Sequence, residues 1–214
     1  SGNPWHRDPL PVLRLTRNVG GDRHERRFLL LIPDSYGPEV LVSRDIEPTR
    51  LAASEVRIRV AAAGVNFADV VGRIGNYPDA PPMPYTPGYE VSGTVIELGA
   101  DAGGLAIGDQ VCAFTRFGGY SEEVVTRAEA VFPLPAGVDL VTAAGVPVTY
   151  LTARTCLFEV GDLRPGKRVL ILGGAGGVGS AAIQLALPAQ ATILATAGSA
   201  AKCDWMRAQG VHHA

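Results

Sequence analysis

Long apolar runs, paired cysteines and an excess of one charge are all missing from this sequence of 214 residues. No apolar run approaches the roughly 18–20 residues that a membrane-spanning helix needs, so we expect no such span. The cysteines Cys112, Cys156 and Cys203 form no C-x-x-C pair, which excludes a zinc knuckle and a dithiol redox motif. Their odd number favours a reducing compartment, and we expect a cytoplasmic location. The net charge of −2 argues against a general nucleic-acid binder.

Glycine and proline are abundant, with 26 and 16 residues. Because no Gly-X-Y period runs through them, they indicate turns and glycine-rich loops rather than collagen. A hydrophobic fraction of 47% with only 19% charged residues excludes intrinsic disorder. The length admits one large domain or two small ones.

The first part of the chain has the pattern of a β-rich domain. Residues 1–26 hold many arginines and few periodic apolar residues, so we interpret them as an N-terminal arm, either a surface extension or a partner-binding segment. Short apolar segments then recur between turn residues, which predicts strands. These segments are residues 28–32, 40–42, 56–60, 91–98, 111–114 and 122–126. In the third of them, apolar residues alternate with Arg57 and Arg59, which is typical of a half-buried strand.

After Pro135 the spacing becomes helical and then alternates between strand and helix. Apolar residues between 140 and 157 share one stripe at helical spacing. A short apolar strand over 169–172 precedes a glycine-rich turn, and a helix follows from Ser180 until Pro188. A second strand over 192–196 and a helix over 200–209 follow, with Gly210 as its cap. This order predicts a parallel α/β unit.

The glycine turn fits the dinucleotide-binding pattern G-x-G-x-x-G, with Gly174, Gly176 and Gly179 in the fixed positions and Gly177 and Val178 between them. Such a pattern gains weight when a strand precedes it and a helix follows it, as predicted here. The glycines allow a tight turn, let the backbone approach a pyrophosphate and let the helix pack on the strand. We therefore predict nucleotide binding, the alternative being a purely structural turn.

The residues after the second strand of this unit favour NADPH over NADH. An NAD site usually places an acidic residue there, but no Asp or Glu occurs between residues 163 and 203. Ser199 and Lys202 instead offer a hydroxyl and an ammonium group, which suit a 2′-phosphate. Ser199 is equally suited to cap the second helix, and both roles are compatible.

Seven motifs, in this order, resemble the medium-chain dehydrogenase/reductase superfamily in its zinc-free quinone oxidoreductase branch, which includes zeta-crystallin and vesicle amine transport proteins. They are AGVNFAD at 63–69, GNYP at 75–78, PGYEVSG at 87–93, GDQV at 108–111, GY at 119–120, LTA at 151–153 and GAGGVG at 174–179. The resemblance implies a GroES-like β-barrel catalytic domain over residues 27–150, followed over 151–214 by the first part of a NADP-binding Rossmann domain. The expected fold class is thus α/β plus β.

The resemblance also bears on metal binding and on the site residues. Zinc alcohol dehydrogenases of this superfamily have Cys where this chain has Asn66 and His where it has Tyr89. Neither residue is a usual Zn²⁺ ligand, and the cysteine cluster of a structural zinc site is missing, so we expect no metal. The resemblance places Asn66, Asp69 and Tyr77 at the nicotinamide end of an interdomain cleft as catalytic residues, with Thr152 as a cofactor contact.

Each of these roles has a plainer alternative. Asn66 is expected to position the substrate oxygen or the carboxamide, and Tyr77 to donate a hydrogen bond or a proton. Alternatively, Asp69 caps its helix, Tyr77 only packs a loop, and Glu90 supports the barrel.

The expected function is hydride transfer from NADPH to a quinone or to an activated C=C bond of an enone or enoyl acceptor. The alternative is a non-catalytic nucleotide-binding or scaffold protein that kept the fold. The resemblance also implies that only two of about six Rossmann strands are present, as in a piece of a longer, homodimeric enzyme or a shortened relative.

Overall fold

The computed structural model describes residues 12–13, 28–31, 37–47 and 49–214. The chain divides into two compact units between Pro147 and Val148. We call them unit 1 and unit 2 and describe each by itself. The predicted arm 1–26 lies outside the described residues except for β1 (Val12–Leu13), which pairs antiparallel with residues 63–64. The domain boundaries stay predictions.

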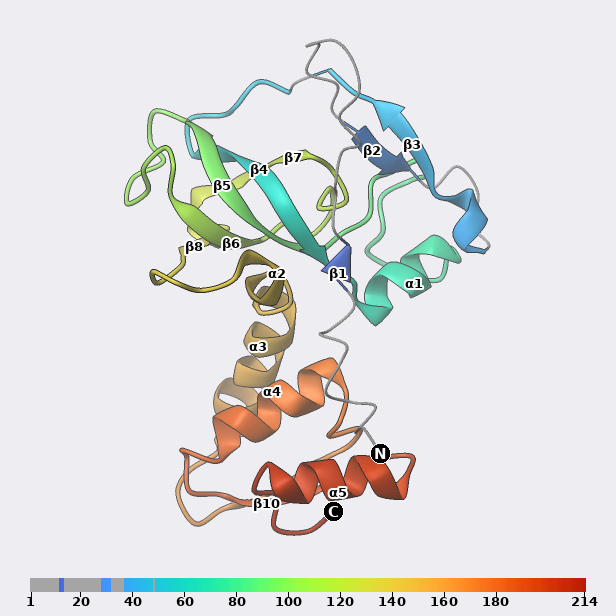
Figure 1. Cartoon of the computed structure of the whole chain (residues 1–214), viewed down its shortest axis with the longest axis vertical. Helices are drawn as coiled ribbons and strands as arrows, with labels where there is room; N and C mark the ends of the chain where they lie inside the picture. Colours follow the sequence, from blue (N-terminus) through green and yellow to red (C-terminus); the bar gives the residue numbers. More distant parts are fainter. Residues whose placement is uncertain (1–11, 14–27, 32–36, 48) are drawn as a thin grey trace. The chain divides into compact units, whose positions relative to one another are not determined.

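Unit 1 is built on an antiparallel sheet of six strands, drawn in Figure 1 from cyan to yellow except for the blue β1. Besides β1, its strands are β4 (Glu55–Gly64), β5 (Glu90–Leu98), β6 (Gln110–Phe114), β7 (Glu123–Arg127) and β8 (Val131–Pro133). They follow the order β1-β4-β5-β6-β8, and β7 pairs with β4. Among the described strands these pairings leave the sheet open instead of closing it into a barrel.

The smaller elements of unit 1 lie outside this sheet. Strands β2 (Phe28–Leu31) and β3 (Val42–Asp45) form a separate antiparallel pair. Two 3₁₀ turns, η1 (Pro38–Val40) and η2 (Ala128–Ala130), precede β3 and β8. The helices are α1 (Phe67–Arg73) and α2 (Leu140–Ala143), and α2 begins where the Asp139 side chain accepts a hydrogen bond from the backbone N–H of Thr142.

The burial of side chains along strand β4 follows the predicted pattern at its apolar positions but not at Arg57. Val56, Ile58 and Val60 are buried in the core of unit 1, and Arg59 is exposed. Arg57 is buried as well, because its guanidinium donates to Glu97 Oε2 at 2.7 Å and to the backbone carbonyl of Thr49. A buried arginine is tolerated when its donors are satisfied in this way. The expected half-buried strand is therefore buried on both faces at this point.

Unit 2 alternates helix and strand. Helix α3 (Pro147–Arg154) continues as a π-helical turn η3 (Thr155–Val160), and β9 (Arg168–Ile171), α4 (Gly177–Ala186), β10 (Thr192–Ala195) and α5 (Ala200–Ala208) follow. Strands β9 and β10 are parallel, from Thr192 opposite Arg168 to Ala195 opposite Ile171. The parallel α/β unit is thus confirmed. The single helical stripe expected over 140–157 is instead divided into α2 and α3.

The core of unit 2 lies between its helices and its short sheet. Ile183 of α4, Ile193 of β10 and Met206 of α5 are almost completely buried. The chain end extends the sheet, because Leu194 and His213 form a parallel bridge and the N–H of Ala195 donates to the carbonyl of His213. In the described part of the chain, no helix has the length and apolarity needed to traverse a bilayer.

Candidate functional site

The predicted catalytic residues Asn66 and Asp69 both lie at the N-terminus of α1. Asn66 is the N-cap residue, and its backbone N–H donates to Asp69 Oδ2 at 2.8 Å. The Asn66 side chain in turn faces the backbone N–H of Asp69, so the two residues form a capping box. The structure therefore gives Asp69 the capping role that the sequence offered as its alternative, and a catalytic role for it stays a prediction.

Two further hydrogen bonds connect this helix start to the beginning of β5. Asp69 Oδ1 accepts from the backbone N–H of Gly88 at 3.0 Å. Asn66 Nδ2 donates to Glu90 Oε1 at 2.8 Å. Both carboxyl groups are buried, with Asp69 6% and Glu90 1% exposed. Because buried polar groups are retained only where they are hydrogen-bonded, this connection defines the geometry of the site.

Burial dominates the electrostatics of these side chains. It raises the pKa of Asp69, against the opposing effect of the hydrogen bonds from Asn66 and Gly88 and of the Tyr120 hydroxyl. Burial also raises the pKa of Tyr120, and the nearby charge of Asp69 adds to this effect. Such a phenol keeps its proton across the physiological pH range, so it can act as a hydrogen-bond donor.

The third predicted catalytic residue, Tyr77, lies in the loop after α1 and packs on an aromatic cluster. Its ring meets that of Tyr89 edge to face, with centroids 5.8 Å apart and an interplanar angle of 76°. Tyr89 also packs on Phe114 and Phe117. The buried Tyr89 hydroxyl faces that of Tyr77 but makes no hydrogen bond of normal geometry within the described residues, and burial raises its pKa. Tyr89 therefore stays a protonated neighbour of Tyr77.

Unit 1 thus brings Asn66, Asp69 and Tyr77 together through the consecutive residues Tyr89 and Glu90. Sequence reasoning assigned Glu90 only to support of the barrel and did not predict its bond to Asn66. The available signal was a charged residue directly before a buried apolar strand, since such a residue needs a polar partner nearby.

The glycine turn of unit 2 is shaped by close packing on one side and is open on the other. A Cβ atom on Gly179 would lie 2.3 Å from the carbonyl oxygen of Gly173 and 2.7 Å from the Gly174 Cα atom, so only glycine fits there. At Gly176, the N-cap residue of α4, a Cβ atom would meet only the Gly173 oxygen, at 3.3 Å. The open side leads to the first N–H groups of α4, which have no partner within the helix and favour an anion.

The other predicted cofactor residues, Ser199, Lys202 and Thr152, lie on the helices α3 and α5 of unit 2. Ser199 caps α5, since its hydroxyl accepts from the backbone N–H of Lys202 at 3.4 Å. Thr196, after β10, receives a hydrogen bond from the Gly173 N–H on its side chain and from the Gly174 N–H on its carbonyl, so it fixes the turn against β10. Thr152 lies on α3 with its side chain exposed. The cofactor contacts of Ser199, Lys202 and Thr152 stay predictions.

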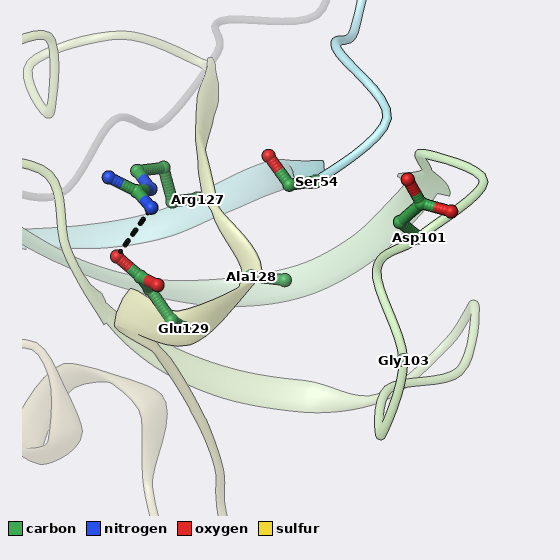
Figure 2. A pocket seen from close by; sticks show the side chains of 6 residues that line it. All are labelled: Ser54, Asp101, Gly103, Arg127, Ala128 and Glu129. Atoms are coloured by element: carbon green, nitrogen blue, oxygen red, sulfur yellow. Dashed lines mark ion pairs between the residues drawn. The ribbon is translucent and has the colours of Figure 1, made fainter.

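A pocket of about 280 Å³ lies elsewhere in unit 1, as Figure 2 shows. An exposed ion pair between Arg127 and Glu129, 3.0 Å long, crosses one side of it. The remaining lining residues are Ser54, Asp101, Gly103 and Ala128. None of the predicted site residues contributes to it, and exposed ion pairs of this kind are weak.

The described ranges of the chain also bear on metal binding. No three side chains of His, Cys, Asp or Glu gather there in a group suited to a metal ion. All three cysteines are free thiols. The expectation that the protein works without zinc stays a prediction.

Known proteins resemble this chain in both sequence and fold. Residues 52–136 match the family model of the alcohol dehydrogenase GroES-like domain. The chain is 38% identical over 178 residues to the mouse synaptic vesicle membrane protein VAT-1 homolog and 36% identical over 197 residues to mouse quinone oxidoreductase-like protein 2. It superposes on the crystal structure of the CurK enoyl reductase with a TM-score of 0.81 and 31% identity.

These matches cover most of this chain but only part of each relative. The two mouse alignments span 83% and 91% of this chain, and 44% and 55% of the relatives. The CurK superposition covers 88% of this chain and 59% of that structure. The chain therefore spans about half the length of the curated relatives it matches. The predicted fold class, a GroES-like domain followed by a Rossmann-like parallel α/β unit, is confirmed.

Proposed function

Because this chain belongs to the medium-chain dehydrogenase/reductase superfamily, we propose that it acts as a zinc-independent oxidoreductase that uses NADPH. Its acceptor is a quinone or the activated C=C bond of an enone or enoyl compound. The names of the relatives support both acceptor classes, since one is a quinone oxidoreductase-like protein and another an enoyl reductase. The proposal includes a cytoplasmic, homodimeric protein.

The glycine turn is the observation that carries the proposal. Its inner side is closed by backbone packing at Gly179, whereas Gly176 and the first turn of α4 face outward. A pyrophosphate fits such a site, because it accepts hydrogen bonds from backbone N–H groups and is attracted by the positive end of the helix dipole. These residues therefore fit the cofactor that the family implies.

The choice of NADPH rests on the residues that follow β10. The chain has no acidic side chain between residues 163 and 203, so nothing there is suited to hold a 2′-hydroxyl as an NAD site does. Ser199 and Lys202 lie at the start of α5. Their hydroxyl and ammonium groups would hold the 2′-phosphate by charge-assisted hydrogen bonds.

Unit 1 would supply the polar groups for the acceptor. When bound, NADPH supplies a hydride from C4 of its nicotinamide ring. A quinone or an activated C=C bond also takes up one proton, which gives a hydroquinone or a saturated product. Tyr77 is the residue that we assign to donate this proton or a hydrogen bond, and Asn66 binds the acceptor oxygen. Aromatic packing on Tyr89 holds the Tyr77 ring in place.

The test is acceptor-dependent oxidation of NADPH by the whole protein, followed as loss of nicotinamide absorbance with a benzoquinone and with an α,β-unsaturated ketone. We expect at least one acceptor to accelerate oxidation, and Tyr77→Phe to lower kcat by about tenfold or more. Tyr150→Phe is the matched control, because the Tyr150 hydroxyl bonds Gln184 on the exposed surface of unit 2.

Two results would contradict the proposal in different ways. If NADPH raises the melting temperature but no acceptor accelerates its oxidation, the protein is a nucleotide-binding protein without this activity. If NADPH changes neither the melting temperature nor any rate, the nucleotide site itself is wrongly assigned.

A further inference from the structure

The hydrogen bonds of Asn66 define which way its carboxamide points. A carboxamide has one accepting oxygen and two N–H groups, and an ionised carboxylate can only accept. The nitrogen atom therefore faces Glu90, where Nδ2 and Oε1 are 2.8 Å apart. The oxygen atom faces the backbone N–H of Asp69, which also donates to the Asn66 backbone carbonyl at 3.1 Å. Among the described residues, no hydrogen bond engages the second N–H of this carboxamide.

Glu90 is held rigidly enough to enforce this orientation. It is 1% exposed at the first position of β5. Its carboxyl group lies directly against the end of β4, so that a Cβ atom on Gly64 would overlap it. The charge of Glu90 contributes to the raised pKa of the buried Cys112 thiol, after the larger effect of burial. Burial of a charged group is costly, so it needs a compensating role in folding or in function.

We propose that Glu90 is a positioning residue that fixes the Asn66 carboxamide as a hydrogen-bond donor to the oxygen of the acceptor. The proposal rests on the function proposed above and sharpens it. Since the free group of Asn66 is an N–H, the ligand atom beside it has to be an acceptor, such as a quinone or enone carbonyl oxygen. Reduction places negative charge on this oxygen, and a preorganised donor stabilises it.

The alternative interpretation is that the hydrogen bond between Asn66 and Glu90 is purely structural and only connects α1 to β5. The two interpretations can be distinguished by exchanging the donor and the acceptor of this hydrogen bond. In the double variant Asn66→Asp with Glu90→Gln, the glutamine N–H donates to the new aspartate, so the hydrogen bond between α1 and β5 is kept. The aspartate then offers only acceptors, and the donor for the ligand is lost.

The experiment compares wild type with Asn66→Asp, Glu90→Gln and the double variant, each in the whole protein. We expect Asn66→Asp to lower the melting temperature, because two carboxylates then face each other, and the double variant to recover most of that loss. We expect kcat of the double variant to stay about 100-fold or more below wild type, the size typical of a lost oxyanion donor. The KM for NADPH should change less than twofold. Glu90→Gln alone should lower kcat only a few fold, because its oxygen can still accept from Asn66.

Three outcomes bear on the proposal. A double variant that is stable but slow supports it, even if Asn66→Asp alone fails to fold. A double variant that recovers both kcat and stability overturns the proposal, and the hydrogen bond then has only a structural role. A double variant no more stable than Asn66→Asp also overturns it, because the two side chains are then not bonded. A wild type inactive with every acceptor would instead refute the proposed function.

Discussion

At the scale of single residues, Ser199 and Lys202 combine local structure with a predicted cofactor contact. The Ser199 hydroxyl accepts a backbone hydrogen bond and so caps α5, as the sequence predicted. A hydroxyl can still donate while it accepts, so capping leaves its proton available to a phosphate. Lys202 lies in the first turn of the same helix and is half-buried. Under the proposed function, this lysine would be the main determinant of cofactor choice.

We predict that Lys202→Ala raises the dissociation constant for NADPH by about tenfold or more, the size of a lost charge-assisted hydrogen bond, and changes that for NADH by less than about twofold. Titration calorimetry with both cofactors measures the difference. Arg207→Ala is the matched control, since Arg207 lies on the same helix and pairs with Asp204. Equal losses for both cofactors would contradict the assignment of the 2′-phosphate.

At the scale of elements, two glycines of the turn between β9 and α4 have different roles. Gly179 is required for packing, because it lets the first turn of α4 approach the backbone at Gly173 and Gly174. Gly176 has an ordinary φ of −88°, and a Cβ atom there would make one tight contact, 3.3 Å from the Gly173 oxygen, so its lack of a side chain matters less for the fold than that of Gly179. The two substitutions by alanine should therefore have different consequences.

We predict that Gly179→Ala destabilises the protein by about 1–3 kcal/mol, because its methyl group would overlap backbone atoms that cannot move aside. Gly176→Ala should cost less stability than Gly179→Ala, about 1 kcal/mol or less, because its one tight contact is 3.3 Å long. It should nevertheless weaken NADPH binding by about tenfold or more, because the methyl group would stand between the backbone and the pyrophosphate. Thermal unfolding and NADPH titration of both variants provide the measurements. Equal stability of the two variants would show that the close approach at Gly179 is not required.

The elements also show what the sequence can predict and what it cannot. The strand and helix pattern of unit 2 was predictable, because short apolar strands and glycine or proline boundaries are local signals. The burial of Arg57 was not, since its partner Glu97 lies on the neighbouring strand β5. The division of the helical stripe was also missed, although α2 ends at Ala143 and Pro147 begins α3, a position that proline favours.

The candidate site also contains a contact that local sequence patterns could not predict. Asn66, Asp69 and Tyr77 were predicted from motifs, and the structure connects all three to the segment from Gly88 to Glu90. The bond between Asn66 and Glu90 joins residues on different elements. No local pattern encodes such a pair, because strand pairing and helix placement bring it together.

At the scale of the whole molecule, the two units carry different parts of the proposed function. The capping residues and aromatic cluster of unit 1 would bind the acceptor, and the glycine turn of unit 2 would bind NADPH. The direct consequences of cofactor binding should therefore concentrate in unit 2.

We predict that saturating NADPH slows backbone amide exchange over residues 173–180 and 199–203 of the whole protein, by up to about 100-fold at a concentration 100 times the dissociation constant. Residues 56–60, in the core of β4, serve as the internal control and should change little. Hydrogen–deuterium exchange with mass spectrometry measures all three segments. Exchange that is unchanged over 173–180 would contradict the nucleotide site.

Strand β7 pairs with β4 and not with the strand that precedes it in the chain. The pairs β4–β5 and β5–β6 join consecutive strands, but β4–β7 aligns Val56 with Thr126 and so encloses β5 and β6 in its loop. Chain entropy opposes the closure of a longer loop, and such non-local pairings slow folding. The topology of unit 1 therefore makes the pairing of β7 with β4 a non-local step that is expected to slow folding.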